Sequence, residues 1–282
     1  MLRAISRSLL LIVITLPLRA EGDGPAPEKA PELRIMKTAG GVRFGIWPDL
    51  PQQPAPTLFV FSGTIEGTLG DAYYRQAANT LAKKGYLCVS IDLPCHGLEQ
   101  RDGEPAGIAG WRHRCEQNQD FVADLTGRLK AVLDHLIENK LTDPHRIAAS
   151  GTSRGGYAAL QFAAADPRVK AVAAFAPVTD LAVLTEFRGA EQNALVQRSS
   201  LEQRAGDIAG RGVWLVMGDR DERVGTDQMI RFARKVTTEA IRLKREARVD
   251  LHILAEPKGH TTPAGSADLA AEWIEQQLSL GM

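Results

Sequence analysis

The sequence predicts an α/β fold, with a mostly parallel sheet and helices on both faces. The main observation is alternation along residues 34–282, where short apolar runs are separated by longer stretches with helical periodicity. A second observation is the composition, with 44% hydrophobic and 24% charged residues among 282, which is typical of a globular protein with a substantial core. We therefore expect one domain over residues 34–282.

The first half of this domain is predicted to open with one or two antiparallel edge strands over residues 34–47. Apolar runs then predict buried strands, and apolar side chains at three- and four-residue steps predict helices. In chain order these are a strand over 57–61, a helix over 73–84, a strand over 86–92 and a long amphipathic helix over 118–139. Residues 98–117, which include Trp111 among basic residues, are predicted to form a long loop.

The second half continues the alternation of strands and helices. In chain order we expect a strand over 146–150, a helix over 156–165, strands over 169–176 and 213–217, a helix over 227–245, a strand over 249–254 and a helix over 267–280. The polar segment 182–210 lies between two of these strands and is predicted to be largely helical. No internal repeat interrupts the pattern.

The N-terminus has the three parts of a secretory signal. Two arginines among the first seven residues precede a short apolar run over residues 9–18, which ends close to the small residue Ala20. A membrane anchor is the alternative, but a span needs about 20 apolar residues, and this run is shorter. We expect residues 1–20 to be a signal peptide and residues 21–33 a flexible linker, so that the mature chain, with no membrane span, is periplasmic or secreted.

The charge balance and the cysteines indicate which partners, metals and disulfides to expect. Lys and Arg total 34, as do Asp and Glu, and no long basic run indicates a nucleic-acid partner. The three cysteines lack the CxxC spacing of a metal site, and we expect neither a metal nor a cofactor. Cys88 is predicted to be a core residue. Cys95 and Cys115 either pair, as an oxidising compartment would allow, or remain free thiols.

A candidate nucleophile, Ser153, lies in the turn between a predicted strand and a predicted helix. Glycines stand two residues before and after it, in the motif Gly151-Thr152-Ser153-Arg154-Gly155. A sharp turn of this kind exposes the serine hydroxyl and leaves little room for side chains beside it. The motif alone is weak evidence, because a glycine-rich turn before a helix can produce it. The strand before it and the helix after it favour the catalytic interpretation.

A serine nucleophile needs a base, and the base needs an acid that orients it. His260 follows the last predicted strand and precedes the last helix, which makes it the candidate base. Asp219 and Asp221 follow an earlier strand end, and Asp180 follows another. Nucleophile, acid and histidine therefore occur in the chain order of the fold that carries this serine motif.

The combination resembles the α/β-hydrolase superfamily, and within it the dienelactone-hydrolase and prolyl-oligopeptidase-like group of esterases and peptidases. That group combines a GxSxGG turn, a GxxDxxV acid turn and a late Gly-His, and the resemblance covers about residues 40–280. It implies an α/β-hydrolase fold with about eight strands. It also places the acid on Asp221, because Gly218 stands three residues before it and Val224 three after, and it places the base on His260.

The resemblance further implies an oxyanion hole made of two backbone amides. One is the amide of Arg154, the residue after the nucleophile. The other lies in the loop after Phe61, where relatives carry His-Gly-x and this chain carries Ser62-Gly63-Thr64, so the third position assigns it to Thr64. His96 lies in a turn similar to a structural turn of the family and is expected to pack rather than to catalyse.

These residues predict a serine hydrolase that cleaves small-molecule carboxylic esters through an acyl-enzyme intermediate and without a cofactor. A serine peptidase acting on short peptides and a non-catalytic hydrolase-fold binding module are the alternatives. The presence of all three triad residue types in order argues against the binding module. Residues 182–210 could form a lid, and residues 98–117 could hold an acidic or sugar-bearing substrate or form a solvated surface loop.

Overall fold

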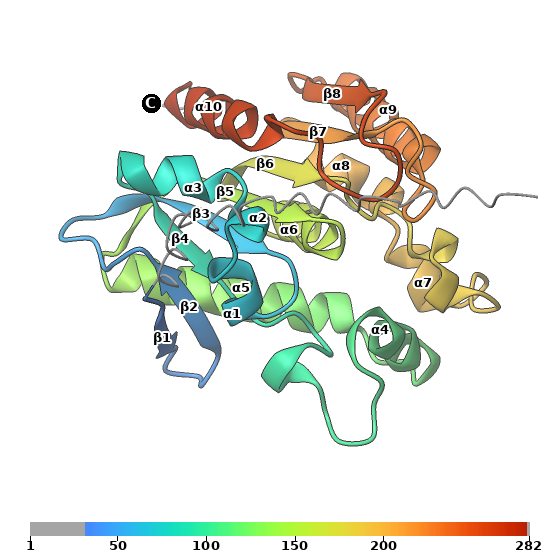
Figure 1. Cartoon of the computed structure of the whole chain (residues 1–282), viewed down its shortest axis with the longest axis horizontal. Coiled ribbons are helices and arrows are strands. Elements are labelled where there is room, and N and C mark those ends of the chain that lie inside the picture. The colour runs from blue at the N-terminus through green and yellow to red at the C-terminus, as the bar shows by residue number, and fades with distance from the viewer. Residues whose placement is uncertain (1–31, 281–282) are drawn as a thin grey trace, which may run out of the picture. The chain divides into compact units, whose positions relative to one another are not determined.

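The computed structural model describes residues 32–280, which form an α/β structure around one eight-stranded sheet (Figure 1). The strand order is β1-β2-β4-β3-β5-β6-β7-β8. The pairings β1–β2 and β2–β4 are antiparallel and the others are parallel. The strands are β1 (Arg34–Lys37), β2 (Arg43–Trp47), β3 (Ala55–Phe61), β4 (Leu87–Ser90), β5 (Thr142–Thr152), β6 (Val169–Phe175), β7 (Gly212–Gly218) and β8 (Arg248–Leu254). The predicted fold class is confirmed, including its antiparallel edge.

Helices cover both faces of this sheet. The α-helices are α1 (Ile65–Leu69), α2 (Ala72–Arg75), α3 (Ala78–Leu81), α4 (Gly107–Glu116), α5 (Phe121–Glu138), α6 (Arg154–Ala165), α7 (Ala194–Arg198), α8 (Ala205–Ile208), α9 (Thr226–Arg242) and α10 (Ser266–Ser279). Short 3-10 helices are η1 (Ala82–Lys84), η2 (Gly97–Glu99), η3 (Leu181–Val183), η4 (Thr185–Phe187) and η5 (Leu201–Arg204). None of the helices that the structure describes has the length and apolar content needed to cross a bilayer.

Two buried apolar clusters hold these layers together, one on each face of the sheet. Successive side chains of a strand point to opposite faces, so Phe59 of β3 joins one cluster, while Leu58 and Val60 join the other. The first cluster contains side chains of α5, α6 and α9, and the second contains side chains of α3 and α10. The apolar stripes of these helices are therefore what attaches them to the sheet.

Helix α5 shows how the sequence pattern becomes structure. It starts after Asp120, whose carboxylate accepts hydrogen bonds from the amides of Val122 and Ala123 and so caps the helix. Its stripe, which includes Leu125 and Leu129, is fully buried. Burial of each such leucine stabilises the folded state by about 1.5–3 kcal/mol. The helix spans Phe121–Glu138, close to the predicted range of 118–139.

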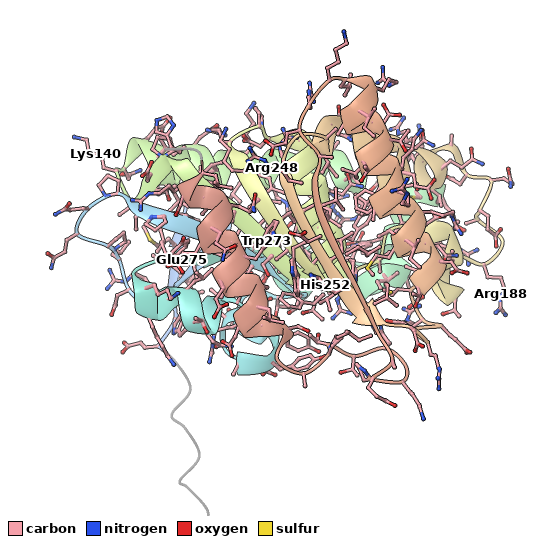
Figure 2. The ribbon with its side chains drawn as sticks, turned by 90° about the horizontal axis from the view of Figure 1, so that it is seen from above. Lys140, Arg188, Arg248, His252, Trp273 and Glu275 are labelled. Carbon is pink, nitrogen blue, oxygen red and sulfur yellow. The ribbon has the colours of Figure 1, made fainter. Side chains whose placement is uncertain are left out.

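Strand β8 lies at the end of the sheet and pairs only with β7. Figure 2 shows Arg248 and His252 along this strand and Trp273 on the neighbouring helix α10. The indole nitrogen of Trp273 donates to the carboxylate of Asp250 on β8, and the rings of His252 and Trp214 lie 5.1 Å apart. These contacts fix the strand from which the chain continues toward His260.

Two expectations about secondary structure are corrected. The predicted helix over 73–84 is broken into α2, α3 and η1, because Gln76 has a φ of 46° and turns the chain. The predicted loop over 98–117 contains α4, in which Trp111 is fully buried and stacks on Phe121. The segment 182–210 is largely helical, as predicted, and consists of the short helices η3, η4, α7, η5 and α8.

The remaining predictions concern the three cysteines and the N-terminal segment. All three cysteines are buried free thiols, so Cys95 and Cys115 are not bonded to each other, and Cys88 is a core residue as predicted. The predicted signal peptide over 1–20 and nearly all of the predicted linker over 21–33 lie outside the described residues.

Candidate active site

The turn between β5 and α6 holds Ser153 in a strained backbone conformation. Its φ is 56° and its ψ is −117°, a region that residues with a side chain rarely adopt. Its amide donates to the carbonyl of Phe175 at 2.9 Å, and its carbonyl accepts from the amide of Val178 at 3.2 Å. The end of β6 thus fixes the turn, and the strand-turn-helix context that the serine motif requires is present.

The glycines around Ser153 are required by close packing. A Cβ on Gly155 would overlap the carbonyl of Phe61 in β3, and a Cβ on Gly151 would overlap the backbone of Gly155. A Cβ on Gly156 would lie 2.8 Å from the Cβ of Pro177. The glycines therefore allow α6 to start directly against the sheet, which is what aims Ser153 outward.

His260 lies between Ser153 and Asp221. Its Nε2 is 2.9 Å from the Ser153 Oγ, and its Nδ1 is 2.8 Å from the Asp221 Oδ2. A carboxylate oxygen can only accept, so Nδ1 carries the proton and Nε2 is free to accept from the serine hydroxyl. This is the arrangement by which a histidine activates a serine.

Asp221 is the carboxylate that the structure brings to His260. Its side chain is 0% exposed, and its Oδ1 accepts from the amides of Arg223 and Val224 at 3.1 and 3.2 Å. With His260, three donors satisfy this buried carboxylate. Asp219 is exposed, and Asp180 accepts from the amide of Ala182 as the cap of η3, so neither of them reaches the histidine.

The sequence profile of the prolyl oligopeptidase family matches residues 72–279, a range that contains Ser153, Asp221 and His260. The chain belongs to the prolyl oligopeptidase family. The predicted resemblance to the prolyl-oligopeptidase-like group is therefore confirmed.

Among curated proteins, the chain is 36% identical over 129 residues to one named hydrolase LUC6 from a Fusarium species. The match covers 46% of this chain and 28% of that protein. The chain thus spans 28% of the length of the curated relatives it matches.

Solved structures of both peptidases and esterases share this fold. A puromycin-hydrolysing peptidase from Mycobacterium tuberculosis superposes with a TM-score of 0.65 at 18% identity, over 90% of this chain and 41% of that chain. A cold-adapted esterase from an Arctic intertidal metagenomic library superposes with a TM-score of 0.61 at 19% identity, over 87% of this chain and 92% of that chain. At these identities the likeness shows the α/β-hydrolase fold.

The Ser153 hydroxyl and His260 open into a polar cavity of about 190 Å³. Its lining residues are Ser62, Tyr73, Tyr74, Thr152, Ser153, Arg154, Ala176, His260 and Thr261. A larger cavity of about 640 Å³ lies where β6, β7 and β8 begin, and no triad residue lines it. Among residues 32–280 no group of three or more His, Cys, Asp or Glu side chains could hold a metal ion. The small cavity is therefore the candidate substrate site.

The predicted oxyanion hole consists of two backbone amides, those of Arg154 and Thr64. The amide of Arg154 lies in the first turn of α6, where helix amides have no intrahelical acceptor. In the loop after β3, the amide of Ser62 donates to the Thr68 hydroxyl and that of Ile65 to Asp92, while no acceptor within residues 32–280 engages the amide of Thr64. Thr64 caps α1 and does not line the cavity, so its role as second donor stays a prediction.

Two residues that the sequence did not indicate hold the loop after His260. The Tyr73 hydroxyl accepts from the amide of Thr262 at 3.2 Å and lies 3.1 Å from the Thr261 hydroxyl. The side-chain amide of Gln76 donates to the Thr262 hydroxyl at 3.2 Å. No motif or periodicity links residues so far apart in the chain, so only the folded structure could show that α2 positions this loop.

His96 packs beside the site without entering the cavity. Its Nδ1 donates to the carbonyl of Pro94 at 2.9 Å, and its ring lies against Trp111 at 5.9 Å. Burial lowers the pKa of His96 to about 4, so the ring is neutral at ordinary pH. The expectation that it packs rather than catalyses agrees with this placement.

The two segments considered for specificity contribute no lining residue to the cavity. Arg112 of α4 donates to the carbonyls of Glu186 and Arg188, both at 3.1 Å, so the two segments pack on each other. Arg114 is buried and paired with Glu104 at 2.6 Å. Most of residues 98–106 are exposed, as the solvated-loop alternative expects, whereas the second half of the segment is the helix α4, in which Trp111 and Arg114 are buried within the fold.

Proposed function

We propose that this protein hydrolyses small carboxylic esters, with Ser153 as nucleophile, His260 as general base and Asp221 as the acid that orients the histidine. One observation carries the proposal, namely the continuous chain of contacts from Asp221 through His260 to Ser153, at 2.8 and 2.9 Å. Distances of this size allow a proton to pass directly between the serine and the histidine.

The proposed reaction has two halves. Ser153 Oγ attacks the ester carbonyl while its proton passes to His260 Nε2, and the imidazolium that forms is stabilised by Asp221. The amides of Arg154 and Thr64 stabilise the oxyanion, and His260 then gives the proton to the leaving alcohol. Water, deprotonated by His260, attacks the acyl-enzyme, and His260 returns this proton to Ser153 Oγ as the bond between Oγ and the acyl carbon breaks. The carboxylic acid is released, and the free serine and the neutral histidine are restored.

The volume and polarity of the cavity favour esters with short acyl groups. A cavity of about 190 Å³ is below the usual size of a drug-like ligand site, and most of its lining residues are polar. Membership of the prolyl oligopeptidase family favours the second candidate, hydrolysis of short peptides by the same three residues. The two candidates differ in the leaving group that His260 must protonate.

A substrate panel separates these candidates. The purified protein is assayed with p-nitrophenyl esters of two to ten acyl carbons and with aminoacyl and prolyl p-nitroanilides, with Ser153→Ala as the control. We expect hydrolysis of the shortest esters, a fall in kcat/KM with acyl length, and no turnover by Ser153→Ala. Faster cleavage of the nitroanilides would favour the peptidase, and a folded but inactive wild type would favour the non-catalytic module.

We further propose that residues 1–20 direct export and are removed after Ala20. The support is the charged start, short apolar middle and small final residue of this segment. Mass spectrometry of the protein recovered from the periplasm or medium of a bacterial host tests this. A mature chain beginning at Glu21 is expected, and a chain that keeps Met1 and stays in the cytosolic fraction would contradict export.

A further inference from the structure

Arg154 gives the candidate substrate cavity an unbalanced positive charge. Arg154 lines the cavity together with Ser153 and His260, and it is the lining residue with a permanent formal charge. No aspartate or glutamate lines this cavity. The sequence assigned a role only to the backbone amide of Arg154, so its guanidinium is left without a function.

The guanidinium is held in place from one side only. Its Nε donates to the carbonyl of Ser62 at 2.7 Å, and a Cβ placed on Gly63 would lie 3.3 Å from its Nη2. Between residues 32 and 280, no group accepts a hydrogen bond from its two terminal nitrogens, and no carboxylate lies within 4 Å of it. One edge of the group is therefore anchored to the loop after β3, and the donors on the other nitrogens remain available.

The surroundings make an anionic partner favourable. Burial lowers the pKa of Arg154, and the nearby cation Arg223 acts in the same direction. An arginine keeps its charge under such conditions, because its ordinary pKa exceeds 12. Glu186, whose negative charge acts on Arg154, is already paired with Arg223 at 2.6 Å. A partly desolvated cation without a counter-ion is costly, and a bound anion would offset that cost.

We infer that the Arg154 guanidinium binds a carboxylate of the substrate, so that the preferred substrates are short esters with an acidic group near the scissile carbonyl, such as hemiesters of small dicarboxylic acids. The inference rests on the proposed function of Ser153. Arginine suits this role because its planar fork of donors matches a carboxylate. The small cavity keeps such a carboxylate within a few bonds of the carbonyl that Ser153 attacks.

A purely structural role is the rival explanation, since the Nε of Arg154 also supports the loop that carries Thr64. Loss of that support would slow all esters alike. The test must therefore measure a ratio between two esters that differ only in charge. Monoethyl succinate and ethyl 4-oxopentanoate meet this condition, because a carboxylate in the first is replaced by a neutral acetyl group of similar shape in the second.

The experiment measures ethanol release from both esters by the full-length protein, by Arg154→Met and by Arg154→Lys. We expect the wild type to prefer monoethyl succinate by at least about 10-fold in kcat/KM, which is the contribution of one charge-assisted hydrogen bond or more. Arg154→Met should lower this preference by about 10- to 100-fold, and Arg154→Lys should keep part of it. Salt should weaken the preference of the wild type.

Arg220→Met is the matched control, because Arg220 is an exposed cation outside the cavity and its removal should leave the preference unchanged. Equal hydrolysis of both esters by the wild type, or a preference that survives Arg154→Met, would overturn the inference and leave the esterase proposal standing. Failure of the wild type to hydrolyse any ester of the p-nitrophenyl panel would instead overturn the proposed function, and the inference with it.

Discussion

Single residues decide which carboxylate can serve the histidine. Asp219 and Asp221 lie two positions apart on the loop after β7, yet the first is exposed beside Arg220 and the second is buried with three hydrogen-bond donors. The fixed donors hold the Asp221 carboxylate in one orientation, and that orientation selects the His260 tautomer. An exposed side chain on a surface loop supplies neither effect.

Replacing Asp221 by asparagine should therefore lower kcat by about 10³- to 10⁴-fold, because an amide group at this position can favour the wrong tautomer of His260. Asp219→Asn should stay within about twofold of the wild type, since a surface charge contributes little. Initial rates with p-nitrophenyl acetate measure both. Comparable losses in the two variants would contradict the assignment of the acid.

The buried side chain of His96 makes the stability of the protein depend on pH. Its folded pKa is lowered by burial to about 4, whereas the unfolded imidazole titrates near 6.5. Between these values the unfolded chain binds more protons, so this residue makes stability fall as pH falls. The effect amounts to about 2 kcal/mol between pH 7 and pH 5. The pKa of Glu104, held at about 2 by Arg114, affects stability only at lower pH.

Urea unfolding at pH 7 and pH 5 tests this effect. The wild type should lose about 2 kcal/mol more between the two pH values than His96→Gln, which cannot take up a proton. The variant itself is expected to be less stable at pH 7, so the comparison uses the change with pH. An identical change in both proteins would show that His96 titrates normally in the fold.

At the scale of elements, the start of α6 determines both the packing of the helix and the placement of Ser153. The helix begins against the carbonyl of Phe61, and only glycine at position 155 permits this approach. The same contact fixes where Ser153 and the amide of Arg154 lie. Packing of the helix on the sheet and placement of Ser153 therefore depend on the same few backbone atoms.

Gly155→Ala should destabilise the protein by roughly 3 kcal/mol or more, because the added Cβ forces α6 away from β3. Gly127→Ala is the control, since Gly127 lies in the interior of α5 with nothing within 4 Å of an added Cβ. That change should stabilise by about 0.5–1 kcal/mol. Urea denaturation of both variants checks the signs, and a neutral Gly155→Ala would contradict the packing described for α6.

Elements with a strong periodic pattern could be predicted from the sequence, and those held by distant partners could not. The apolar stripe of α5 was sufficient to identify that helix. Helix α4 was missed because its basic residues indicated a solvated loop, whereas Arg114 is buried by pairing with Glu104. The break at Gln76 was missed as well, and the side chain of this residue bonds to Thr262, far along the chain.

For the whole molecule, the topology assembles the site from three strands. Ser153, Asp221 and His260 follow the carboxyl ends of β5, β7 and β8, which lie close together on one side of the sheet. The strand ends and their chain order are visible in the sequence, so the three residues could be named in advance. The size of the cavity and the free guanidinium of Arg154 could not, because loops that are distant in sequence form that wall.

The most direct test of the central claim is covalent labelling of the nucleophile. A fluorophosphonate probe reacts with a serine only when a neighbouring base activates it. Mass spectrometry of the labelled protein should show one equivalent of probe, located on Ser153 and absent from Ser153→Ala, together with loss of ester hydrolysis. A folded wild-type protein that takes up no probe, or that carries it on another residue, would contradict the account.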